Sequence, residues 1–120
     1  MAKTILLMTG NSVKKEAIAV VCKSLRIELK EIRPGNINSP IGGFLGLPLN
    51  DKPSKMAPAL FNLPELMIFN GLSDKDLDMF LDKYKDAGIE PILYKGVITP
   101  YNITWSPYEF ILEYEKEQKK

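Results

Sequence analysis

The sequence contains no histidine and only one cysteine, Cys22, among its 120 residues. Without histidine the chain lacks the commonest general base, the imidazole metal ligand and every Ser-His or Cys-His catalytic arrangement. A single cysteine excludes an intramolecular disulfide and a cysteine-rich metal site. Because Cys22 lies in an apolar run, we expect a small buried thiol in the core rather than a reactive one.

The sequence also lacks an excess of charge of one sign and long apolar segments. The 16 Lys and Arg residues nearly balance the 15 Asp and Glu residues, which leaves a formal net charge of +1. Such a balance creates no long-range field toward nucleic acid or acidic lipid. No apolar run approaches the length of a membrane span, and the first residues are wrongly flanked for a signal peptide. We therefore predict a cytoplasmic protein with no nucleic-acid or membrane partner, no metal and no cofactor.

The composition is that of an ordinary globular protein, with 45% hydrophobic and 26% charged residues. A chain of this length fits one domain, and we predict a single domain over residues 1–120. Within it we expect a first β-α-β unit at 3–33 and a Gly/Pro-rich connection at 34–64. A second β-α-β unit with a C-terminal helix is expected at 65–118.

The first unit begins with an apolar run from Thr4 to Thr9, which favours a strand buried on both faces. Ser12 is the expected cap of a helix that starts at Val13. A second strand is expected from Leu29 to Ile32. We expect one apolar stripe of the helix to face the core, and the charged Lys14, Lys15, Glu16 and Lys23 to lie on other faces: the stripe is Val13, Ala17, Val20, Val21 and Leu25.

The second unit repeats this layout. Strands are expected from Glu65 to Phe69 and from Ile92 to Ile98, with Ser73 capping the helix between them. Gly88 stands where a left-handed residue should end that helix. The stripe expected to face the core is Leu77, Phe80, Leu81 and Tyr84.

A last helix is announced by Ser106 and Glu109, which form a capping box around a proline at the first helical position. We expect this helix to bury Phe110, Ile111 and Tyr114. Alternating strands and helices indicate β-α-β units. The predicted fold class is α/β, with a small, mainly parallel four-stranded sheet made of two β-α-β units, helices on both faces and a C-terminal helix.

The connection at 34–64 differs in kind, because it holds six of the nine prolines and four of the eight glycines. Connections this long are uncommon inside a compact domain. Its centre, residues 40–48, is too apolar for a free linker, so we expect it to lie against the core or against a partner. For the second case the expected interface residues are Phe44, Leu45 and Leu47, in a homo-oligomer or a complex with another protein.

From residue 65 onward the chain carries E-L-M-I-F-N-G-L-S at 65–73 and Y-K-G-V-I-T-P-Y-N-I-T-W at 94–105. This part, up to about residue 115, resembles a bacterial family catalogued as domain of unknown function 3783. The family's pattern in the second stretch is similar to L-K-A-V-L-T-P-x-N-x-x-W, with Tyr94 and Gly96 replacing the usual Leu and Ala. The resemblance implies a relative but no activity.

Ligands of open parallel sheets bind beyond the carboxyl ends of the strands. The candidate ligand-binding residues there are Lys95, Thr99, Asn102, Trp105 and Asn11. Each has a structural alternative. Asn11 and its neighbours match ordinary turn and capping chemistry. Lys95 suits a solvated lysine, an ion pair, an anion contact or a catalytic amine.

Trp105 suits a recognition surface, or a hydrophobic staple that packs on Phe110. The Thr99-Pro100 bond suits a rigid turn or a cis peptide. No phosphate-binding glycine motif follows the first strand. Two functions stay open. The favoured one is a non-catalytic binding or regulatory module, and the alternative is a small-molecule-binding enzyme with its site at the strand ends.

Overall fold

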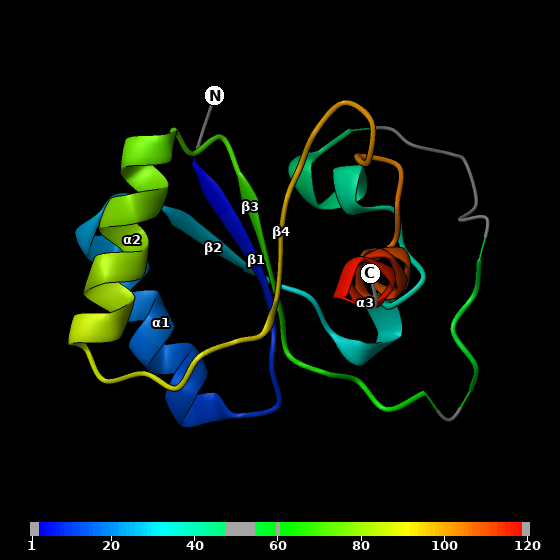
Figure 1. Cartoon of the computed structure of the whole chain (residues 1–120), viewed down its shortest axis with the longest axis horizontal. Coiled ribbons are helices and arrows are strands. Elements are labelled where there is room, and N and C mark those ends of the chain that lie inside the picture. The colour runs from blue at the N-terminus through cyan, green and yellow to red at the C-terminus, as the bar shows by residue number, and fades with distance from the viewer. Residues whose placement is uncertain (1–2, 48–54, 60, 119–120) are drawn as a thin grey trace.

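The computed structural model describes residues 3–47, 55–59 and 61–118. Four strands form one sheet in the order β2-β1-β3-β4, so that β2 and β4 are its outer strands (Figure 1). The strands are β1 (Thr4–Met8), β2 (Glu28–Glu31), β3 (Leu66–Asn70) and β4 (Tyr94–Val97). The helices are α1 (Ser12–Ser24), α2 (Asp74–Asp86) and α3 (Pro107–Gln118). This is the expected α/β fold.

The sheet is mixed, and the prediction of a mainly parallel sheet was wrong. Within each β-α-β unit the strands are parallel, because a crossover helix joins them: β1 with β2, and β3 with β4. The two units meet at the centre through β1 and β3, which are antiparallel. The second unit is therefore turned end for end relative to the first.

The long connection sets this direction. β2 leaves the sheet where Glu31 lies beside Leu7, and β3 enters where Leu66 lies beside Met8. The chain thus returns at the same end of the sheet at which it left, and β3 must run back against β1. Residues 34–64 carry no periodic signal for this route, so the sequence pattern left the relative direction of the two units undetermined.

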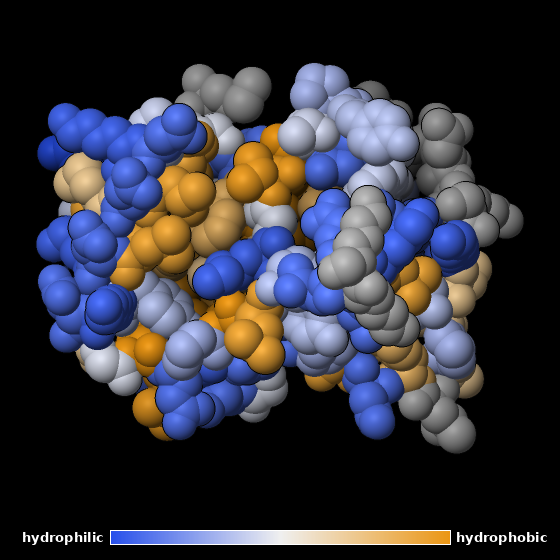
Figure 2. All heavy atoms as spheres, in the orientation of Figure 1, coloured by the Kyte–Doolittle hydropathy of each residue, from blue (hydrophilic) through white to orange (hydrophobic). Residues whose placement is uncertain are grey.

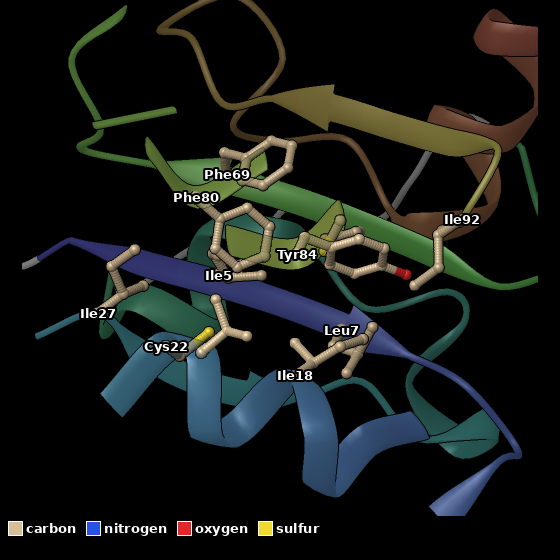
Figure 3. Packing of buried hydrophobic residues seen from close by; sticks show 11 residues of the cluster. Ile5, Leu7, Ile18, Cys22, Ile27, Phe69, Phe80, Tyr84 and Ile92 are labelled. Carbon is tan, nitrogen blue, oxygen red and sulfur yellow. The ribbon is translucent and has the colours of Figure 1, made fainter. Parts of the chain in front are cut away.

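Three layers result, with α1 and α2 on one face of the sheet and α3 with the connection on the other (Figure 1). The central strands β1 and β3 are buried on both faces, as expected for β1. On the α1/α2 face, Cys22 packs among Ile5, Ile18 and Ile27 (Figure 3). Its burial raises the pKa of the thiol to about 11, which confirms a core cysteine. No helix in the described residues is long and apolar enough to cross a membrane.

The prediction for the buried face of α1 was confirmed for Val21 and Leu25 but was otherwise wrong. Val13 and Val20 are exposed, whereas Lys14 is buried together with Ile18, Val21 and Cys22. The cap is Asn11 rather than Ser12, since the Asn11 side chain accepts a hydrogen bond from the Lys14 N–H at 3.0 Å. The long aliphatic stem of Lys14 lets it occupy a core position while its ammonium reaches a carboxylate.

Local signals in the second unit are confirmed. Ser73 caps α2 in a reciprocal capping box with Asp76, and Gly88 follows the helix at a left-handed φ of 70°. Ser106 and Glu109 bond reciprocally at the start of α3, at 3.1 and 3.2 Å. The last strand is shorter than predicted, however, because β4 covers only Tyr94–Val97.

The apolar centre of the connection lies against the molecule's own core, one of the two expected outcomes. It forms a 3-10 helix at Ile41–Leu45, with Ile41 fully buried. The N–H groups of Ile41 and Gly42 donate to the carbonyls of Trp105 and Ile103, at 2.8 and 2.9 Å. These bonds fasten the connection to the loop between β4 and α3. Residue 48, the end of the predicted segment 40–48, lies outside the described residues.

Candidate functional site

β4 is the outer strand of the second unit, and α3 packs against it. Phe110, near the start of α3, packs on Gly96, and Tyr114, one turn later, packs on Tyr94 with ring centroids 5.1 Å apart. A Cβ on Gly96 would lie only 3.0 Å from the Phe110 ring. The absence of a side chain at Gly96 therefore permits this close approach of helix and strand.

Two hollows follow the line between β4 and α3. The first, about 330 Å³, is lined from β4 by Lys95, Gly96 and Val97, and from α3 by Phe110, Glu113, Tyr114 and Glu117. The second, about 360 Å³, is lined by Leu93, Tyr94, Tyr114, Glu115 and Gln118. They share Tyr114 and together we call them the β4–α3 groove.

Aromatic side chains close the first hollow on the side of the loop. Tyr101 lies edge-on to Trp105, and Trp105 lies edge-on to Phe110, with ring centroids 5.8 and 5.3 Å apart. Trp105 immediately precedes the helix cap, so its contact with Phe110 is the hydrophobic staple. Trp105 also lines the hollow, so the staple does not remove it from a binding role.

Thr99 and Asn102 build the turn that follows β4. The Thr99 N–H donates to the Asn102 side-chain oxygen at 2.8 Å, and the Asn102 N–H donates to the Thr99 hydroxyl at 3.2 Å. The Asn102 side-chain amide donates to the Val97 carbonyl at 3.0 Å. The Thr99-Pro100 bond is trans. Asn102 lines the first hollow whereas Thr99 does not, and the turn uses polar groups of both.

Lys95 lies on the outer strand and is exposed. In the part of the chain that the structure describes, it forms no ion pair with Glu113 or Glu117 across the groove. The environment is that of a solvated lysine on an outer strand.

The model of a family described as Domain of unknown function (DUF3783) matches residues 65–120. The match confirms the resemblance seen in the sequence. No curated protein and no solved structure matches the chain.

The whole β4–α3 groove lies within the DUF3783 part of the chain. The structure gives a physical meaning to the motif residues around it. Asn102 closes the turn after β4, and Trp105 staples α3. Gly96, which has no side chain, lets the strand approach Phe110 closely. The motif thus maintains the local geometry that creates the groove.

Asn11 does not join the other candidates. It follows β1, whose Met8 lies beside Leu66 at the start of β3, whereas Asn102 follows the far end of β4. The reversed second unit therefore places Asn11 at the opposite end of the sheet. Of the five candidates, Lys95, Asn102 and Trp105 line one hollow.

Near Asn11 lies a polar cluster that sequence reasoning missed. The Lys14 ammonium donates to Glu65 at 2.7 Å, and the Thr9 hydroxyl donates to the other oxygen of the same carboxylate at 2.5 Å. Burial raises the pKa of Glu65, but the hydrogen bonds and the charge of Lys14 outweigh it, so the pKa lies below its ordinary value. The sequence feature that could have indicated this cluster is a glutamate directly before a strand that is buried on both faces.

The predicted interface residues of the connection are divided between core and surface. Phe44 packs partly buried against the core, and its carbonyl accepts a hydrogen bond from Lys30 at 2.8 Å. Leu45 and Leu47 line a separate hollow of about 260 Å³. Of these three residues, Leu47 is exposed, whereas Phe44 and Leu45 are partly buried. A partner contact through this segment stays a prediction.

Proposed function

We propose that this protein is a non-catalytic binding module whose ligand occupies the β4–α3 groove. The observation that supports it most is the meeting of aromatic side chains and polar groups in one concave surface. Tyr101, Trp105 and Tyr114 offer apolar contact area, and Lys95, Glu113 and Glu117 offer charges of both signs. Ligand sites in proteins combine apolar walls with a few convergent polar groups in this way.

The enzyme alternative has less support from this geometry. It required the polar residues after β1 and β4 to converge at one end of a parallel sheet, and the mixed sheet separates Asn11 from Lys95 and Asn102. We further propose that the module works in the cytoplasm of a bacterial cell. A homo-oligomer or partner contact through Leu45 and Leu47 is a separate proposal.

Trp105 provides the test, because it is the chain's only tryptophan and it lines the groove. A screen of nucleotides, inorganic phosphate, small carboxylic acids and short peptides would follow its emission together with the melting temperature. We expect a compound that changes both. Its affinity should fall about tenfold in Tyr101→Ala, since Tyr101 is 82% exposed and offers contact area rather than core packing.

Val13→Ala is the matched control, because Val13 is an exposed apolar residue on α1, away from the groove. Its affinity should equal that of the wild type. If no compound in the screen changes both signals, or if Tyr101→Ala binds as tightly as the wild type, the proposed function is wrong.

A further inference from the structure

We infer that the occupant of the β4–α3 groove is an extended peptide segment that pairs with β4 as a further strand and alternates apolar with basic side chains. The inference rests on the proposed function and names the class of ligand. It depends on three independent features: the backbone of β4, the shape of the groove and the side chains on its two sides.

The outer backbone of β4 is available for pairing. The Ile98 N–H donates to the Phe69 carbonyl, so by the alternation of a parallel pair the N–H and C=O groups of Lys95 and Val97 point away from β3. The Val97 carbonyl already accepts a hydrogen bond from the Asn102 side-chain amide. In the described part of the sheet, no strand pairs with the remaining groups. Such an edge is a template for strand addition.

The groove is elongated along this edge. Its two hollows share Tyr114, and together they accompany the strand from Leu93 to Val97. At about 3.3 Å per residue, an extended segment needs only about five residues to follow that length. A compact small molecule would fill one hollow and leave the other empty.

Alternate residues of an added strand would face the two sides of the sheet. On the α3 side they would meet Glu113, Glu115 and Glu117, which favour basic residues. On the α2 side they would meet Lys95 and Val97, because their partners in β3, Met67 and Phe69, belong to the core cluster on that face. Val97 is 51% accessible. Figure 2 shows the apolar surface that lies between α2 and β4. A segment of alternating apolar and basic residues satisfies both sides.

A second copy of the chain fits this edge less well. Antiparallel pairing of two β4 strands in one continuous sheet would place both α3 helices on the same face, next to the junction. Glu113, Glu115 and Glu117 of one copy would then approach the same residues of the other. Like charges at close range oppose such pairing, whereas a basic peptide gains from it.

The test uses an acetylated and amidated heptapeptide of alternating valine and lysine, compared with its valine–glutamate counterpart by calorimetric titration. We expect the valine–lysine peptide to bind at least tenfold more tightly. This preference should largely disappear in the double variant Glu113→Gln and Glu117→Gln. Glu16→Gln removes an exposed carboxylate on α1 and should retain the preference.

N-methylation of the peptide distinguishes strand pairing from a purely electrostatic contact. Two peptides would be compared, one methylated on the amides of its odd residues and the other on those of its even residues. One should lose binding and the other should keep it, because only one of these two sets of N–H groups faces β4. Val97→Pro removes an outward N–H of β4 and should weaken binding, since proline is tolerated on outer strands where the N–H faces solvent. Circular dichroism would verify that this variant is folded.

Three results of the peptide titrations would overturn the inference: equal binding of the two peptides, indifference to the methylation frame, or no peptide binding at all. If no peptide binds but another compound changes the Trp105 emission in a Tyr101-dependent way, the inference fails and the proposed function stands. A dimer in light scattering that Val97→Pro dissociates would show that a second copy occupies the edge, and this would also overturn it.

Discussion

Lys14 illustrates how a single residue changes the meaning of a helical pattern. The aliphatic stem of the lysine belongs to the buried face of α1, while its ammonium bonds with Glu65 and the Pro91 carbonyl, at 2.7 and 3.4 Å. A charge at such a position stabilises only when it is paired. Lys14 therefore ties the first unit to the beginning of the second.

The carboxylate of Glu65 makes this tie dependent on pH. Because the pKa of Glu65 lies below its ordinary value of 4.5, its contribution to stability is present above that pH and is lost as the pH falls through the lowered pKa. Glu65→Gln should lower the free energy of unfolding at pH 7 by roughly 1–3 kcal/mol. Urea denaturation repeated at a pH below 4.5 should show that this difference shrinks.

Glu16→Gln, at an exposed position of α1, is the control and should leave the unfolding free energy unchanged at both pH values. A Glu65→Gln protein that is as stable as the wild type at pH 7 would contradict a stabilising role of the ion pair.

The structural role that the sequence assigned correctly, the hydrophobic staple of Trp105 on Phe110, is a local one. Trp105 and Asn102 act on neighbours within five positions, through the staple and the turn. Asn11 was assigned to the wrong group because its position relative to Lys95 depends on the direction of the second unit. No local pattern encodes that direction.

At the scale of elements, α3 depends on its first turn. Ser106 is fully buried, and its hydroxyl accepts the Glu109 N–H while the Glu109 side chain accepts the Ser106 N–H. Ser106→Ala should lower the free energy of unfolding by about 1 kcal/mol, because it removes the hydroxyl that accepts the Glu109 N–H. Thermal or urea unfolding measures the change.

Ser106→Thr retains the hydroxyl acceptor and should lose less stability than Ser106→Ala. Equal stability of Ser106→Ala and the wild type would show that the capping box contributes nothing to α3. Since α3 forms one wall of the β4–α3 groove, the same variant also reports how far the groove depends on the cap.

The existence of each helix and strand was predictable from the sequence, but the order of the strands in the sheet was not. Apolar runs and caps indicated four strands and three helices, and the structure contains them. That β4 is an outer strand follows from the order β2-β1-β3-β4, which is set by contacts between distant segments. The groove could not be anticipated without that order.

For the whole molecule, the reversal of the second unit is the decisive feature. It places β1 and β3 at the centre and leaves the outer edge of β4 beside α3. The connection stabilises this arrangement through Ile41 and Gly42, which bond to the loop between β4 and α3. The folded chain thus presents one strand edge with an acidic helix next to it.

Amide hydrogen exchange at β4, with and without the valine–lysine heptapeptide, tests this account most directly. In the free protein, the Lys95 and Val97 amides should exchange rapidly, and those of Gly96 and Ile98 slowly, because only the latter pair point toward β3. At saturating peptide, we predict strong new protection of Lys95 and Val97. Binding without any added protection at these two amides would contradict strand pairing at β4.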